Sequence, residues 1–202
     1  MCQGHEWRFQ MKYLFLLTMI LGHVTFAHDK HTDSLKAGTP LGGTSILQLD
    51  SSWKNQKGES VKLTDLRGKN RFVVMLYTRC DTACPLIVED LKGIATEIDS
   101  KNADKVEVSI FSLDSLRESP ASLLAFSKKR KLPSQWGLLT SDSDAVAELA
   151  AALGVRYKRL QNGDFIHSNV IYFLNKNGEV VAQKEGLKTP RTEFLKQVRK
   201  NL

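Results

Sequence analysis

The chain has 202 residues, of which 42% are hydrophobic and 25% are charged, and its formal net charge is +7. These values are typical of a globular domain, and they exclude an intrinsically disordered chain, a collagen-like chain and a multi-span membrane protein. The three cysteines are too few for a small scaffold held together by disulfide bonds.

The N-terminal segment differs from the rest of the chain. Residues 13–27 form an apolar run with basic residues before it, which is the pattern of a secretory signal peptide. We therefore expect residues 1–27 to be a signal peptide and the mature chain to begin near His28. The alternative is an uncleaved anchor in the inner membrane through residues 13–27, although a span needs about 20 apolar residues.

If the protein is exported, its positive net charge favours only certain classes of binding partner. Loss of residues 1–27 removes Arg8, Lys12 and Glu6, so the net charge falls from +7 to +6. In an exported protein this charge favours acidic proteins or anionic membrane surfaces over nucleic acid as partners. We expect no nucleic acid partner, and a location that is periplasmic or membrane-anchored facing the periplasm. The basic run Lys128–Lys131 is interpreted as a solvated surface.

Residues 28–43 are polar and rich in glycine, and they predict a linker to one domain over residues 44–202. The domain begins with a predicted N-terminal β-hairpin. In this hairpin Ser45–Asp50 and Ser52–Val61 are extended, and Lys57-Gly58 makes the turn.

The rest of the domain alternates predicted strands and helices. Continuous apolar runs indicate buried strands, and apolar residues at helical spacing between capping residues indicate helices. In chain order, the predicted elements are a helical turn at Leu63–Arg67, a strand at Phe72–Tyr77, a helix from Pro85 through Ile98, a strand at Val106–Leu113, a helix from Ser119 to Arg130, a short strand at Trp136–Leu139, a helix from Asp142 to Leu153, strands at Val155–Leu160 and Phe165–Leu174, a turn at Asn177-Gly178, a strand at Val180–Gln183 and a helix that starts at Thr189-Pro190. This order predicts an α/β fold with a central mixed sheet flanked by helices.

Cys80 and Cys84 lie between the buried strand Phe72–Tyr77 and the helix that follows it. A helix N-terminus has free N–H groups and a partial positive charge, and both stabilise a thiolate. A thiolate pair can carry out disulfide exchange or bind a soft metal ion. The alternative is a structural disulfide without chemistry, but reactive cysteines gather at such junctions. Cys2 lies in the predicted signal peptide.

His167 is the one histidine after position 31, and an apolar strand follows it. A lone histidine is more often packed or solvated than a metal ligand, so its spacing alone leaves both interpretations open. With the two thiolates, its imidazole would form a soft three-coordinate site suited to copper. Zinc is the alternative, but structural zinc sites almost always have four protein ligands and we find no fourth.

Three blocks of the sequence resemble the Sco/SenC family, whose members are copper-binding relatives of thioredoxin and peroxiredoxin. The first block is YTRCDTACP at Tyr77–Pro85, which resembles the family's Cys-x-x-x-Cys-Pro signature. The second is FSLDSLRESPASL at Phe111–Leu123, and the third is His167-Ser168 followed by NVIYFLNKNGEV. The blocks occur in the order of the family, and the resemblance covers about Ser45 to Leu202.

The resemblance implies a thioredoxin-like fold in which Cys80, Cys84 and His167 bind a copper ion. It implies delivery of copper to the copper-bearing subunit of cytochrome c oxidase, or maintenance of the thiols of that copper centre, with another copper or thiol protein as the alternative partner. The alternative function is that of a periplasmic thiol–disulfide oxidoreductase with Cys80 and Cys84 as catalytic residues.

A peroxidase is a weaker hypothesis. Peroxiredoxins place a threonine three residues before their reactive cysteine, whereas Thr78 lies two residues before Cys80. A passive interaction module is a further alternative, and it would tolerate mutation of all three predicted ligands.

Several positions depart from the pattern of the family. The departures are Ser115 for a proline, Glu118 for an aspartate and Ile166 for an aspartate. A carboxylate beside His167 would orient or tune its ring, so the change at Ile166 predicts an effect on metal affinity rather than on the ligand set. Asp114 and Arg117 are predicted to pair as a structural lock near the site.

Overall fold

The computed structural model describes residues 36, 38, 45–102 and 106–202. The predicted signal segment 1–27, with Cys2, and most of the predicted linker 28–43 lie outside these residues. In the part of the chain that is described, no helix has the length and apolar character needed to cross a membrane.

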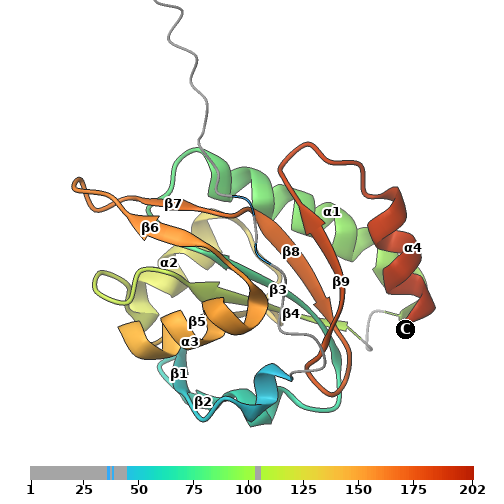
Figure 1. Ribbon diagram of the computed structural model, residues 1–202, viewed down its shortest axis with the longest axis horizontal. Coiled ribbons are helices and arrows are strands. Elements are labelled where there is room, and N and C mark those ends of the chain that lie inside the picture. Colours follow the sequence, from blue (N-terminus) through green and yellow to red (C-terminus); the bar gives the residue numbers. More distant parts are fainter. Residues whose placement is uncertain (1–35, 37, 39–44, 103–105) are drawn as a thin grey trace, which may run out of the picture. The chain divides into compact units, whose positions relative to one another are not determined.

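A mixed β-sheet forms the centre of the domain (Figure 1). The strands are β1 (Ser52–Asn55), β2 (Ser60–Lys62), β3 (Asn70–Leu76), β4 (Val106–Ser112), β5 (Gly137–Thr140), β6 (Tyr157–Arg159), β7 (Phe165–His167), β8 (Val170–Leu174) and β9 (Val180–Glu185). The main sheet has the order β2-β1-β5-β4-β3-β8-β9, and β6 and β7 pair in a sheet of their own. Strands β3, β4 and β5 are parallel, and the other pairs are antiparallel.

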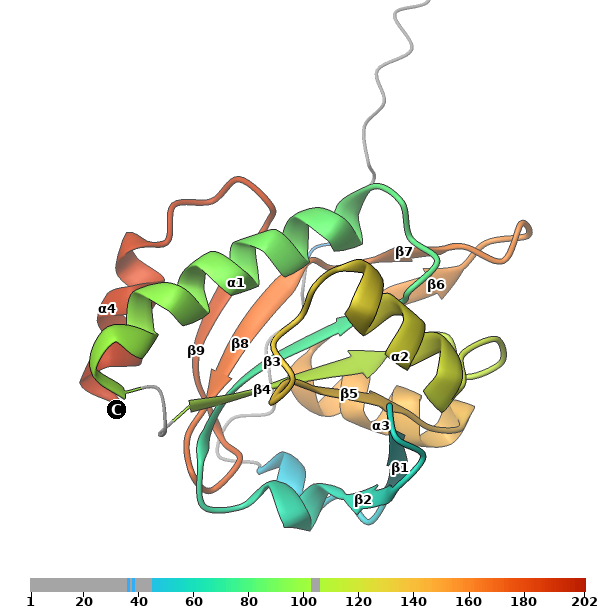
Figure 2. The same cartoon turned by 180° about the vertical axis from the view of Figure 1, so that it is seen from behind.

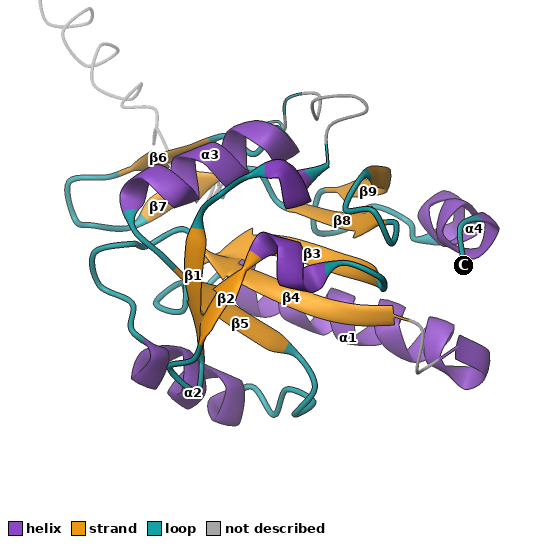
Figure 3. Cartoon of the chain, turned by 90° about the horizontal axis from the view of Figure 1, so that it is seen from below, coloured by secondary structure: helices purple, strands orange, loops and turns teal. Residues whose placement is uncertain are grey.

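Helices cover both faces of the main sheet. The α-helices of the described residues are α1 (Ala83–Asn102), α2 (Pro120–Lys129), α3 (Ser143–Leu153) and α4 (Thr192–Lys200), and the 3-10 segments are η1 (Ile46–Gln48) and η2 (Leu63–Leu66). Helices α1, α2 and α4 pack on one face, whereas α3 and both 3-10 segments pack on the other (Figures 2 and 3). The predicted α/β fold with a central mixed sheet between helices is confirmed.

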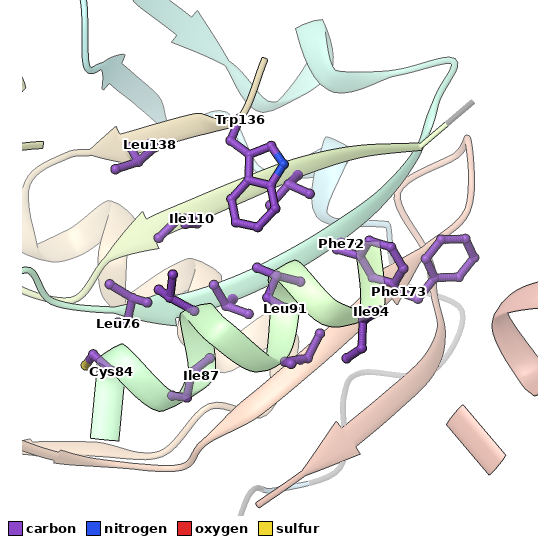
Figure 4. Close-up of a cluster of buried hydrophobic side chains, with 14 of the residues drawn as sticks. Phe72, Leu76, Cys84, Ile87, Leu91, Ile94, Ile110, Trp136, Leu138 and Phe173 are labelled. Carbon is purple, nitrogen blue, oxygen red and sulfur yellow. The ribbon is translucent and has the colours of Figure 1, made fainter. Parts of the chain in front are cut away.

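Strand β3 divides the core into two parts because its side chains alternate between the two faces of the sheet. Phe72 and Leu76 pack against α1, and Val73 and Met75 pack on the side of α3. Every residue of β3 is buried. The apolar run predicts this for Phe72–Leu76, whereas the burial of the polar Asn70 and Arg71 was not predicted. Figure 4 shows the core on the α1 side, which extends along the helix to Cys84, so the thiol end of α1 is part of the core.

The predicted N-terminal hairpin is confirmed in part. Strands β1 and β2 pair as its arms, and Lys57-Gly58 lies in the turn between them, with Gly58 at a φ of +85°. The prediction of an extended Ser45–Asp50 is wrong, because this stretch contains η1. The hydroxyl of Ser45 accepts a hydrogen bond from the backbone N–H of Leu47 and donates one to the carbonyl of Asn177, which fixes a turn at this point.

The prediction of one continuous strand at Phe165–Leu174 is also wrong. The stretch is divided into β7 and β8, which belong to different sheets. Between them, Ser168 donates its N–H to the carbonyl of Arg156, and its hydroxyl accepts from the N–H of Arg156. His167 is therefore the last residue of β7, at the point where the chain leaves one sheet for the other.

Candidate metal centre

The thiol pair lies where β3 passes into α1. Cys80 is in the connecting loop, and Cys84 is in the first turn of the helix. Both are free thiols with little exposed surface, 6% for Cys80 and 0% for Cys84. The backbone N–H of Cys84 points at the Cys80 sulfur over 3.3 Å, and Thr82 Oγ1 lies 3.9 Å from the same sulfur. The Cys80 sulfur therefore faces the free N–H groups of a helix N-terminus, as the sequence predicts.

The two thiols have opposite pKa shifts. A hydrogen bond from the Cys84 thiol, aided by the backbone N–H groups of residues 82–84, lowers the pKa of Cys80 to about 4, although burial acts in the other direction. Burial, together with the neighbouring Cys80 sulfur, raises the pKa of Cys84 well above its ordinary value. These opposite shifts favour the thiolate form at Cys80 and the protonated thiol at Cys84.

Strand β7 brings His167 to the same place. Its Nε2 lies 3.7 Å from the Cys84 sulfur, and its Nδ1 lies 3.0 Å from the carbonyl oxygen of Ser168. Because a carbonyl only accepts hydrogen bonds, Nδ1 carries the proton and the lone pair of Nε2 faces the sulfur. Burial lowers the pKa of His167, which favours the neutral imidazole that a metal ion requires.

The backbone carbonyl of Ser168 takes the place of the carboxylate that the family pattern has at position 166. A metal-binding histidine usually donates its second N–H to a carboxylate, a backbone carbonyl or water, and this bond orients the ring. Here the backbone supplies the acceptor. The imidazole is therefore oriented without an aspartate at position 166, where Ile166 instead pairs with Lys158 of β6.

One aromatic ring packs against the imidazole and is itself part of a small aromatic cluster. The ring of Tyr77 meets that of His167 edge-on, with centroids 6.1 Å apart, and it also packs against Phe165 at 5.2 Å. Tyr157, which is opposite His167 in the β6–β7 ladder, packs on the same Phe165. Sequence reasoning did not identify Tyr77 as a wall of the site, although its place directly after β3 and before the thiol loop was a usable signal.

The loop between β4 and α2 carries a second polar group of residues. Asp114 is fully buried and pairs with Arg117, whose Nε lies 2.5 Å from a carboxylate oxygen. The predicted ion pair is thus confirmed. Glu118 is also buried, and its carboxylate accepts a hydrogen bond from the backbone N–H of Thr78 at the start of the thiol loop. The sequence showed Glu118 as a departure from the family pattern and gave no sign of this contact.

The relationship of the chain to known proteins agrees with these features. A sequence model of the SCO1/SenC family matches residues 44–202. The chain belongs to the SCO1/SenC family. A SCO1 protein homolog from Bacillus subtilis (strain 168) is 26% identical over 153 residues, which cover 73% of this chain and 79% of the relative.

Two solved Sco structures share the fold of this SCO1/SenC chain. ScoI of Bradyrhizobium japonicum with copper bound is 22% identical with a TM-score of 0.62, over 83% of this chain and 100% of that one. BsSco, a member of the Sco family of cytochrome c oxidase assembly proteins in which a disulfide switch was identified, is 21% identical with a TM-score of 0.65, over 82% and 96%. The predicted thioredoxin-like fold is confirmed.

The donor set of this SCO1/SenC chain suits a soft metal ion. An ion with bonds of about 2.3 Å to sulfur and about 2.0 Å to nitrogen, at an angle of about 120°, holds these atoms about 3.7 Å apart. This is the separation of the Cys84 sulfur and His167 Nε2. Among the described residues, no group of three or more His, Cys, Asp or Glu side chains already stands at metal-binding spacing. The Cys84 sulfur and His167 Nε2 thus lie at a separation that a hydrogen bond and a shared metal ion would both allow, and the Cys80 sulfur is held at the helix N-terminus.

Proposed function

We propose that this protein binds a copper ion through Cys80, Cys84 and His167 and transfers it to the copper-bearing subunit of cytochrome c oxidase. The observation that carries the proposal is the 3.7 Å approach of His167 Nε2 to the Cys84 sulfur. An imidazole whose Nδ1 proton is fixed on a backbone carbonyl has its lone pair free for a metal at this position.

Copper is preferred over other metals because of the donor set. Soft thiolates select Cu(I) or zinc, and imidazole suits both, but structural zinc takes four protein ligands. Three donors, one of them a thiolate near neutral pH, favour a low-coordinate copper ion. The copper-bound ScoI relative and the description of BsSco as belonging to a family of oxidase assembly proteins support the metal and the recipient.

We further propose that the protein acts after export. Residues 1–27 would direct it to the periplasm or hold it at the inner membrane facing the periplasm, residues 28–43 would act as a linker, and residues 44–202 would carry the copper site. The apolar run at 13–27 supports the first part of this scheme, and the family match over residues 44–202 supports the last.

Copper titration of the reduced protein, purified from the exported compartment, tests the site. We expect one Cu(I) per chain in competition with a chelator, and we expect more than about 100-fold weaker binding after Cys80→Ser, Cys84→Ser or His167→Ala, since loss of an outer partner alone weakens metal sites 10- to 100-fold. His31→Ala is the matched control for loss of a histidine. Unchanged affinity in His167→Ala would contradict the proposed ligand set.

Thiol–disulfide exchange is the second candidate function, and the opposite pKa shifts of Cys80 and Cys84 favour it. The Cys80 thiolate would attack a substrate disulfide, form a mixed disulfide and release one substrate thiolate. Cys84, after losing its proton, would then attack the Cys80 sulfur and release the second thiolate, so the substrate is reduced and the pair is oxidised.

The same variants separate the two functions. Exchange with a small disulfide needs both cysteines and no imidazole, so His167→Ala should keep the exchange activity while it loses copper affinity. Normal exchange by Cys80→Ser would exclude the reductase, and it would leave the copper proposal to be decided by the titration.

A further inference from the structure

We propose that residues Asp114–Glu118, here called the clamp loop, set the distance between the thiol pair and His167. Glu118 holds the loop that carries Cys80, here called the thiol half. Arg117 holds the β6–β7 ribbon that carries His167, here called the imidazole half. The proposal rests on the copper function above for its purpose, and for its geometry on contacts that none of the predicted ligands makes itself. No residue of the clamp loop is one of these ligands.

Glu118 fixes the thiol half. Its carboxylate accepts a hydrogen bond from the backbone N–H of Thr78, which lies two residues before Cys80 in the loop between β3 and α1. Directly before the clamp loop, the N–H of Leu113 donates to the carbonyl of Leu76 over 2.8 Å. The end of β4 is therefore joined to the end of β3 and to the beginning of the thiol loop.

Arg117 fixes the imidazole half. Its guanidinium donates a hydrogen bond to the carbonyl of Gly163, in the turn that joins β6 to β7. Gly163 has a φ of +84°, and a Cβ atom there would collide with the Arg117 guanidinium. The close approach therefore depends on glycine, and it lies four residues before His167 on the strand that ends with it.

Asp114 joins the side chains of Arg117 and Glu118, the two arms of the clamp loop, in one hydrogen-bonded turn. Its buried carboxylate accepts from Nε of Arg117 at 2.5 Å. Its backbone carbonyl accepts from the N–H of Arg117 at 3.4 Å and from that of Glu118 at 3.2 Å. The side chains of Arg117 and Glu118 therefore leave one hydrogen-bonded turn in fixed directions, and each of them restrains its own half of the site.

The imidazole half needs such a fixing point because of the sheet topology. The β6–β7 ribbon is a sheet of its own, without strand pairing to the main sheet among the described residues. Its tip projects away from the sheet in Figure 1. Arg117 restrains the ribbon near this tip, so the position of His167 relative to Cys84 should depend on a contact that touches neither residue.

The test is a double-mutant cycle of Gly163→Ala with His167→Ala, read by Cu(I) affinity. In Gly163→Ala the added Cβ would collide with Nη1 of Arg117, so the guanidinium must move away from the Gly163 carbonyl. If the clamp acts through His167, this substitution weakens copper binding about 10- to 100-fold in the wild-type background and has no further effect in His167→Ala. Gly58→Ala is the matched control, since Gly58 has a φ of +85° and no neighbouring atom within 4 Å of an added Cβ. An equal loss in both backgrounds would overturn the proposal.

Two further readouts do not depend on copper. In the reduced protein, nuclear Overhauser contacts between the His167 and Tyr77 rings should weaken in Gly163→Ala, and retention of these contacts would overturn the clamp even if the wild-type protein bound no copper. The reduction potential of the Cys80–Cys84 pair should stay at the wild-type value in Gly163→Ala and should shift in Glu118→Ala, which frees the thiol half. Absence of copper binding by the wild type would reject the proposed function instead.

Discussion

The Cys84 sulfur lies 3.7 Å from Nε2 of His167, although the two residues are 83 positions apart in the chain. Sheet topology produces this contact. Strand β8 runs antiparallel to β3, with Ile171 opposite Val74, so the end of β3 lies beside the start of β8. The thiol loop follows the first strand and His167 precedes the second, so the pairing brings both to one corner of the sheet.

Alkylation of the reduced protein should distinguish the two thiols. Because the pKa of Cys80 is lowered to about 4 and that of Cys84 is raised, we expect iodoacetamide to modify Cys80 more than 10-fold faster at pH 7. The rate at Cys80 should be nearly constant from pH 6 to pH 8, since the thiolate is already formed. Peptide mass spectrometry over time measures both rates.

The control for alkylation is Cys84→Ala, which removes the thiol that donates to Cys80. The pKa of Cys80 should then rise, and its alkylation rate should become dependent on pH in the same range. A wild-type rate that increases about tenfold per pH unit between 6 and 8 would show that Cys80 is not a thiolate.

Copper should stabilise the folded protein. A ligand that binds only the native state, at a free concentration of about 100 times its Kd, adds about 2.7 kcal/mol to the free energy of unfolding. For a domain of this size, that corresponds to an increase in Tm of about 5–10 °C. Calorimetry of the reduced protein with and without Cu(I) measures the shift, and a chelator should reverse it. His167→Ala should lose most of the shift, whereas an equal shift in this variant would mean that copper binds elsewhere.

The ion pairs that Asp90 of α1 makes with Lys184 and Arg191 should contribute strongly to the free energy of unfolding. Asp90 accepts from Lys184 at 2.8 Å and from Arg191 at 2.7 Å, and the Lys184 side chain is 2% exposed. Asp90→Asn leaves the buried Lys184 without its carboxylate partner and should lower the free energy of unfolding by about 3–5 kcal/mol. Urea denaturation measures the change.

Glu97→Gln is the matched control for Asp90→Asn. Glu97 also pairs with Arg191, at 2.8 Å, but its side chain is 44% exposed. Its loss should lower the free energy of unfolding by at most about 1 kcal/mol. Equal losses in the two variants would show that the burial of Lys184 does not determine how much the ion pairs contribute to the free energy of unfolding.

Two glycines with the same backbone conformation should respond differently to alanine. Gly58 and Gly178 have φ values of +85° and +77°, but an added Cβ meets nothing within 4 Å at Gly58, whereas at Gly178 it lies 2.5 Å from Leu47 Cγ. Gly58→Ala should lower the free energy of unfolding by about 1 kcal/mol, and Gly178→Ala by about 1–3 kcal/mol more. Thermal unfolding measures both, and similar values would mean that η1 moves aside easily.

Local signals were enough to predict the centre of the fold. The apolar run of β3 predicted a strand buried on both faces, and the helix after it predicted the environment of the Cys80 sulfur. The division at Ser168 could not be predicted, because its hydrogen-bond partner is the backbone of Arg156, twelve residues away. The same holds for Ser45, whose hydroxyl bonds to Asn177 at the other end of the domain.

The site was predicted as a set of residues rather than as a geometry. The two cysteines follow from their spacing, whereas His167 needed the family resemblance, because a single histidine carries no pattern. The acceptor for its Nδ1 is the backbone carbonyl of Ser168, and because every residue has such a carbonyl, the sequence does not indicate this contact. Contacts such as that of Glu118 with Thr78 arise from the parallel pairing of β3 and β4, and are equally hidden in the sequence.

Both sulfurs belong to the hydrophobic cluster that α1 buries against the sheet. Formation of a bond between them is therefore also a change in core packing, and the two events share one thermodynamic cycle. The difference in unfolding free energy between the oxidised and reduced proteins equals the difference in redox free energy between the folded pair and the same pair in the unfolded chain. Each 1.4 kcal/mol of the former corresponds to about 30 mV of the latter. Two denaturation curves thus report how far the fold itself biases the cysteines toward the dithiol or the disulfide.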